Sequence, residues 1–171
     1  KHWAATTPVV LAAAMVFDAE TLTPIYRWRM GVACGSAGLD IASRLGVEPL
    51  ARIVSRATAG VEPHLFGIGP VEAARTALRR AGISWSDLAA VELNEAFAAQ
   101  SLACLREWPD LDPSIVNPLG GAIAIGHPLG GSGVRILTTL AHHLRRSGGR
   151  YGLAAMCIGV GQGIAIALER V

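Results

Sequence analysis

The sequence has little charge and few aromatic residues. Of its 171 residues, 16% are charged, 5% are aromatic and 51% are hydrophobic, whereas about 25% charged residues is usual. This apolar content excludes intrinsic disorder and suggests that other chains or domains cover part of the surface. The net charge of +2 and the lack of a Lys/Arg run give no indication of nucleic-acid binding.

Cysteine is also scarce, and long apolar runs are missing. The three cysteines, Cys34, Cys104 and Cys157, cannot all pair with one another, which is typical of a reducing compartment, so we expect a cytoplasmic protein. No apolar run reaches the roughly 18 residues of a membrane helix. Residues 8–17 could form a signal-peptide core, but no convincing cleavage site follows, so we expect neither a signal peptide nor a membrane partner.

From residue 36 onward, hydrophobic periodicity predicts strands that alternate with helices. The expected strands are residues 51–59, 88–93, 115–116, 151–157 and 161–169. The expected helices are residues 39–45, 70–81, 94–108 and 134–147. This order predicts a layered α/β domain with a mostly parallel sheet, whose last strand is antiparallel because only a short turn precedes it. Residues 1–35 have no consistent periodicity and are set apart as an atypical lead-in.

Three segments follow predicted strands, and ligands of such sheets bind at the carboxyl ends of strands. In one, Cys157 ends a strand and glycines follow at alternate positions, starting with Gly159. Backbone N–H groups uncovered by such glycines can form an oxyanion hole. The alternative is a tight turn that packs a small thiol.

The other two segments contain a histidine and an asparagine. His127 lies between Gly126 and Pro128 in the glycine-rich loop 120–133, which has neither the phosphate-loop nor the dinucleotide-binding pattern. It could act as a base toward a thiol, donate to an oxyanion, or be incidental to a capped helix start. Asn94 could orient a water or a carbonyl group, or simply be the N-cap of a helix.

Together, these cysteine, histidine and asparagine residues are the types used in thiol-based acyl chemistry. The remaining candidates are weaker. We expect Cys104 to lie in the core and His142 and His143 to be solvated, and we assign His64 no role. The histidine spacing does not indicate a metal site.

The segments TAGVEPHLFGIGP, NEAFAAQ, NPLGGAIAIGHPLGGSG and CIGVGQGIAIALER resemble the C-terminal half of the thiolases, which include acetyl-CoA acetyltransferases and 3-ketoacyl-CoA thiolases. The resemblance covers residues 36–171. It implies a thiolase C-terminal domain with a five-stranded mixed sheet flanked by helices. It also implies acyl transfer in fatty-acid metabolism, either Claisen condensation of acyl-CoA or thiolysis of 3-ketoacyl-CoA. The ending is most similar to thiolases that act on β-ketoadipyl-CoA.

The resemblance implies catalytic roles for four positions. His127 would activate the nucleophilic cysteine and contribute to an oxyanion hole in which Asn94 holds a water. Cys157 would be the general acid/base at the substrate Cα, and the Gly159 N–H would help bind a second oxyanion. A weakly acidic thioester α-proton needs such a base and a site for enolate charge. Coenzyme A thioesters are the expected substrates, with no metal or redox cofactor, and the residues that bind CoA are not assigned.

One departure from the family is large, because the cysteine that becomes acylated belongs to a thiolase N-terminal half with no counterpart in residues 1–35. Cys34 lies in CGSAGL, superficially similar to the nucleophile segment, but with an extra residue and without the expected distance. We therefore expect that Cys34 is not the nucleophile and that the isolated chain is inactive. The expected partners are an acyl-CoA, the missing N-terminal half and sister subunits of a homo-oligomer.

Two other interpretations stay open. The chain could be a non-catalytic half-domain or association module that needs a complementing partner, and a neighbouring reading frame for the missing half would favour this. It could instead be an acyl-CoA-binding regulatory protein, and a calorimetric titration without heat would count against this.

Overall fold

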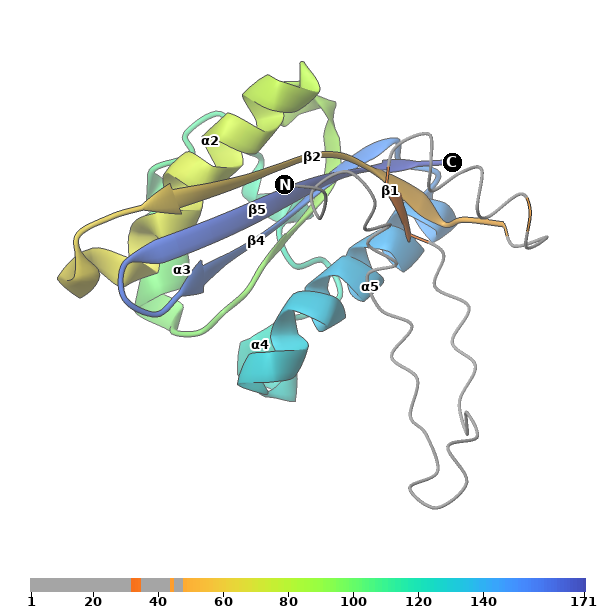
Figure 1. Ribbon diagram of the computed structural model, residues 1–171. Coiled ribbons are helices and arrows are strands. Elements are labelled where there is room, and N and C mark those ends of the chain that lie inside the picture. Colours follow the sequence, from red (N-terminus) through yellow and green to blue (C-terminus); the bar gives the residue numbers. More distant parts are fainter. Residues whose placement is uncertain (1–31, 35–43, 45–47) are drawn as a thin grey trace.

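The computed structural model describes residues 32–34, 44 and 48–171, and its centre is a mixed β-sheet (Figure 1). The strands are β1 (Val32–Cys34), β2 (Ala51–Gly60), β3 (Leu88–Leu93), β4 (Tyr151–Ile158) and β5 (Gln162–Arg170), in the spatial order β1-β2-β5-β4-β3. The β1–β2 and β3–β4 pairs are parallel, and β5 is antiparallel to both of its neighbours. The expected mixed sheet and antiparallel last strand are thus confirmed.

Helices cover both faces of the sheet. The helices are α2 (Gly69–Ala81), α3 (Ala98–Arg106), α4 (Ala122–Ile125) and α5 (Leu129–Ser147), with short 3-10 turns η1 (Pro63–Ile68), η2 (Trp85–Asp87) and η3 (Pro113–Ile115). Figure 1 shows α2 on one face of the sheet and α5 on the other. Within the described residues, no helix has the length and apolarity needed to cross a bilayer.

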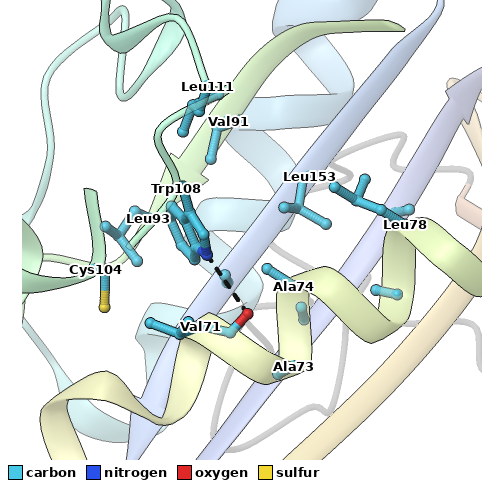
Figure 2. Packing of buried hydrophobic residues seen from close by; sticks show 14 of the residues in the cluster. Val71, Ala73, Ala74, Leu78, Val91, Leu93, Cys104, Trp108, Leu111 and Leu153 are labelled. Carbon is cyan, nitrogen blue, oxygen red and sulfur yellow. Dashed lines mark hydrogen bonds between the residues drawn. The ribbon is translucent and has the colours of Figure 1, made fainter. Parts of the chain in front are cut away.

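The α2 face holds the larger hydrophobic core, shown in Figure 2. Small residues on α2, such as Ala73 and Ala74, are fully buried and let the helix approach the sheet closely. Trp108 fills the space between α2 and β3, and its indole N–H donates to the Val71 carbonyl at 3.4 Å. Cys104 is fully buried in the same core, which confirms its predicted place.

The local signals for α2 predict its ends correctly. Pro70 lies in the first turn, where its missing N–H leaves no helical hydrogen bond unmade. Gly82 ends the helix in the left-handed conformation, and its N–H donates to the carbonyls of Leu78 and Arg79. The expected helix over 39–45 lies outside the described residues, apart from Arg44.

Two element predictions are wrong near the site. The helix expected at 94–108 begins only at Ala98, so Asn94 is not its N-cap. The Asn94 N–H instead donates to the Ala155 carbonyl at 2.9 Å and extends the β3–β4 ladder. The strand expected at 115–116 is the 3-10 turn η3, followed by a single bridge from Val116 to Val91.

The glycine-rich loop is also more regular than expected. It contains the short helix α4, and α5 begins at Leu129 rather than near residue 134. Leu137, Ala141 and Leu144 of α5 are buried in the core on the α5 face of the sheet. Gly148 ends α5 in the left-handed conformation.

Candidate active site

The site is built at the carboxyl end of β3, where Asn94 follows the last strand residue. Asn94 is fully buried, and its side-chain Nδ2 lies 3.4 Å from Nε2 of His127. Its Oδ1 is also buried and accepts no hydrogen bond within the described part of the chain. The structure thus brings together two of the predicted site residues and leaves one buried amide oxygen without a hydrogen-bond partner among the described residues.

Glu95 and Asn117 hold the glycine-rich loop against the end of β3. The Glu95 carboxylate accepts from Asn117 Nδ2 at 3.0 Å and from the Ile123 N–H at 2.9 Å. The Asn117 side chain also accepts from the Leu93 N–H and donates to the Leu93 carbonyl, both at 2.9 Å. The Asn117 side chain therefore pairs with the Leu93 backbone as a neighbouring strand would. Glycine suits position 121 because a Cβ there would collide with the Glu95 carboxylate.

His127 enters the site just before α5, between Gly126 at φ 93° and Pro128. Its Nδ1 lies 2.5 Å from Oγ of Ser132, which is buried in the first turn of α5. The imidazole is thus held at both nitrogens, by a hydroxyl on one side and by the Asn94 amide on the other. An imidazole fixed in this way is suited to general acid–base work.

Cys157 lies near the end of β4, next to the end of β3 in the sheet. It is 8% exposed, and burial raises the pKa of its thiol, an effect that a backbone hydrogen bond partly offsets. It is therefore protonated at neutral pH and suited to donate a proton. Alternation along β4 puts it on the face of Leu153 and Ala155, opposite the face that α5 covers. No hydrogen bond joins it to His127 among the described residues, and the two residues lie at the carboxyl ends of the neighbouring strands β4 and β3.

Gly159 begins the turn between β4 and β5, and a Cβ built on it would meet nothing within 4 Å. The space in front of its backbone is therefore open to a ligand. Gly161 of the same turn has φ 81°, and a Cβ there would collide with the Val61 carbonyl. This glycine is required by the close approach of the chain.

Val160 sits at the tip of this turn at φ 67° and is 78% exposed. A left-handed conformation costs a residue with a Cβ about 1–2 kcal/mol. We expect Val160→Gly to raise the free energy of unfolding by about 0.5–1 kcal/mol, since glycine's larger unfolded-state entropy offsets part of the relief. Chemical denaturation measures the free energy of unfolding, and Val160→Ala is the control because alanine keeps a Cβ. An equal gain in both variants would contradict a backbone cause.

Sequence reasoning missed a buried ion pair beside the site. Glu92 of β3 is fully buried, and its Oε2 accepts from Arg135 Nη1 of α5 at 3.0 Å. Burial raises the pKa of Glu92 to about 7, with the Arg135 charge opposing this and the Glu95 charge adding to it. The sequence does hold one signal for this pair, the glutamate inside the apolar run LAAVEL. A buried carboxylate needs a charged or hydrogen-bonding partner, so its presence there indicates one.

The other candidate residues form no hydrogen bond with Asn94, His127 or Cys157 within the described part of the chain. Burial raises the pKa of Cys104 to about 11, as expected for an inert core thiol. His64 is exposed, whereas His142 and His143 are half-buried rather than solvated as predicted, because they lie on the sides of α5. No group of three or more potential metal ligands occurs within the described residues.

The contacts of Glu95 predict a measurable effect on the loop. We expect Glu95→Ala to lower the free energy of unfolding by about 1–3 kcal/mol, because a side-chain amide and a backbone N–H lose their acceptor. The Ile123 amide should also exchange faster with deuterium. Glu107→Ala removes an exposed carboxylate that lies 3.7 Å from Arg75 and should cost at most about 1 kcal/mol. Unchanged protection at Ile123 would show that Glu95 does not hold the loop.

Comparisons with known proteins agree with this fold. The family model for the thiolase C-terminal domain matches residues 47–170. The 3-oxoadipyl-CoA/3-oxo-5,6-dehydrosuberyl-CoA thiolase of Escherichia coli is 59% identical over 148 residues, which cover 82% of this chain and 37% of that protein. The acetyl-CoA acetyltransferase of Shinella zoogloeoides is 57% identical over 130 residues, which cover 75% and 32% of the two chains.

Solved structures give the same result. A crystal structure of human mitochondrial 3-ketoacyl-CoA thiolase matches with a TM-score of 0.75 at 52% identity, and the match covers 77% of this chain and 33% of that one. The chain thus spans about a third of the length of these relatives. The matched family model and these identities show that the chain belongs to the thiolase family and contains its C-terminal domain.

Proposed function

We propose that this chain supplies the C-terminal half of an acyl-CoA acyltransferase of the thiolase type. The observation that carries the proposal is the contact between the buried Asn94 amide and His127 Nε2 at the end of β3. This contact holds an imidazole beside a buried amide at the carboxyl end of β3, and Cys157 lies near the end of the neighbouring strand β4, which supports His127 as the base and Asn94 as the residue that holds a water. The acylated cysteine comes from a complementary N-terminal half.

In the thiolysis direction, His127 takes the proton of that cysteine, and the thiolate attacks the 3-keto carbon of the substrate. The developing oxyanion is stabilised by His127 and by a water on Asn94. The bond between Cα and the keto carbon then breaks, and its electron pair forms an enolate that the Cys157 thiol protonates at Cα. The Gly159 N–H donates to the enolate oxygen. Cys157, now a thiolate, takes the proton of the incoming CoA, and the CoA thiolate attacks the acyl carbonyl. The acyl group passes to CoA, and the departing cysteine thiolate takes back the proton that His127 holds.

An apolar groove supports the missing half as the partner. It lies beside α5 over the sheet, has a volume of about 380 Å³, and is lined by residues that include Leu129, Val134, Met156, Ile164 and Ile166. Leu129 is 81% exposed, an unusual exposure for a leucine next to other apolar side chains. The same groove also favours the second candidate function, a non-catalytic association module.

The substrate is proposed from the names of relatives. The relatives include β-ketoadipyl-CoA thiolases and acetyl-CoA acetyltransferases at 51–59% identity. One structure of the human 3-ketoacyl-CoA thiolase holds CoA. We therefore propose a 3-oxoacyl-CoA substrate, with 3-oxoadipyl-CoA and acetoacetyl-CoA as the two compounds to compare. The free thiols of Cys104 and Cys157 support a reducing, cytoplasmic location.

A chimera tests the proposal. It joins the N-terminal part of the E. coli relative to residues 48–171 of this chain, and it is expected to cleave both 3-oxoacyl-CoA compounds with CoA. The isolated 171-residue chain is expected to show no turnover and no acyl adduct by intact mass. A folded chimera without thiolysis would contradict the catalytic proposal and favour the association module. An acetyl group on Cys34 of the isolated chain would contradict the need for the missing half.

A further inference from the structure

We propose that Ser132 is a positioning residue that fixes the tautomer of His127, so that Nε2 is the basic nitrogen. This rests on the proposed function, because the tautomer matters for catalysis only if His127 takes a proton from a thiol. Ser132 is 1% exposed, and its Oγ lies 2.5 Å from His127 Nδ1 and 3.2 Å from the Pro128 carbonyl oxygen.

The donors and acceptors around Ser132 permit one arrangement that uses every contact. A carbonyl oxygen only accepts, so the Ser132 hydroxyl proton is donated to Pro128. The hydroxyl oxygen then accepts from the ring, which puts the proton of the neutral imidazole on Nδ1. His127 Nε2 therefore carries the lone pair, and it faces the Asn94 Nδ2, which is a donor.

The opposite tautomer fits these contacts less well. The Ser132 hydroxyl would donate to Nδ1, and its contact with Pro128 would no longer be a hydrogen bond. The ring proton on Nε2 would meet the N–H group of Asn94 unless that amide turned over. Two contacts would be lost or rearranged, so the geometry favours the proton on Nδ1.

The consequence is that His127 offers the lone pair of one defined nitrogen, Nε2, as the base. Before proton transfer, Nε2 offers its lone pair at the end of β3, while Ser132 keeps the Nδ1 proton. When Nε2 takes a thiol proton, the ring becomes a cation with a proton on each nitrogen. The new Nε2–H can then donate to an oxyanion at the same place. Without Ser132 the ring proton is free to occupy either nitrogen, and the wrong tautomer presents an N–H to the thiol.

Nitrogen-15 NMR of the uniformly labelled 171-residue chain tests this inference, at a pH where the ring is neutral. Long-range correlations are expected to show His127 with a protonated Nδ1 and an unprotonated Nε2. Ser132→Ala is expected to lose this single signature and to show a protonated Nε2 in a substantial fraction, whereas Ser132→Thr, which keeps the hydroxyl, restores it.

A matched control exists in the same helix. The Thr138 hydroxyl donates to the Val134 carbonyl at 2.7 Å, the same type of back-bond that Ser132 makes. Thr138→Ala is therefore expected to leave the His127 tautomer unchanged.

A protonated Nε2 in the unmodified chain would overturn the proposal, as would an unchanged tautomer in a folded Ser132→Ala chain. If that variant does not fold, the unmodified and Ser132→Thr spectra still decide. The measurement needs no turnover, so an inactive chimera with the expected tautomer would contradict the proposed function and leave the tautomer assignment intact.

Discussion

Replacing Arg135 with methionine is expected to lower the free energy of unfolding by about 3–5 kcal/mol at pH 8, and by much less near pH 5. The variant leaves the fully buried Glu92 carboxylate without its partner, and an uncompensated buried charge costs about this much. Near pH 5 the cost is smaller, because Glu92, with its pKa raised to about 7, already holds a proton in the folded chain.

The same group sets a pH dependence in the unmodified chain. The pKa of Glu92 is about 7 when folded, against 4.5 as the ordinary value. Between these values the folded chain holds a proton that the unfolded chain has lost. The stability that Glu92 provides is therefore fully present below about pH 4.5 and is lost as the pH rises through 7, by about 3 kcal/mol in total.

Three variants decide whether the pair has this role. Denaturation at pH 5 and pH 8 should give a nearly flat profile for the double variant Glu92→Gln/Arg135→Met, because it removes both charges. Arg145→Met breaks an exposed pair with Glu48 that is 3.0 Å long and should cost at most about 1 kcal/mol at either pH. An equal loss at pH 5 and pH 8 for Arg135→Met would mean that packing of the arginine, and not its charge, stabilises α5.

In the chimera, His127→Ala is expected to reduce kcat/KM for thiolysis by about 10²–10⁴-fold, the usual effect of losing a positioned general base. Asn94→Ala is expected to cost about 10²–10³-fold, because it removes the support of one oxyanion donor. Cys157→Ala removes the proposed proton donor at the substrate Cα and should reduce the rate as strongly as His127→Ala. Steady-state kinetics with acetoacetyl-CoA and CoA measures all three.

Two variants of residues that have no proposed catalytic role serve as controls. His143→Ala changes a half-buried histidine of α5, and Cys104→Ala changes a core thiol on the α2 face. Both are expected to keep most of the rate. If His143→Ala is as slow as His127→Ala, general damage to α5 explains the loss. If Cys157→Ala stays active, the assignment of the proton donor is wrong.

Local patterns predict much of the fold. The ends of α2 follow from Pro70 and Gly82, because each residue type suits a helix end for reasons of its own backbone. Strands β3 to β5 follow from short apolar runs bounded by turns, and β2 follows from its alternation and its β-branched residues. The start of α3 did not follow, since Asn94 is a good N-cap by type but is bound by β4 instead.

The sequence by itself determined the family, the mixed α/β fold and the identity of the candidate site residues, because short motifs and local periodicity encode these. Only the tertiary structure decided that Asn94 meets His127, that Asn117 replaces a strand partner, and that Glu92 pairs with Arg135. These pairs are separated by 24 to 43 residues along the chain. Their contacts depend on how α5 and the loop before it pack against the end of β3. No local pattern records the distance between two elements that meet only after folding.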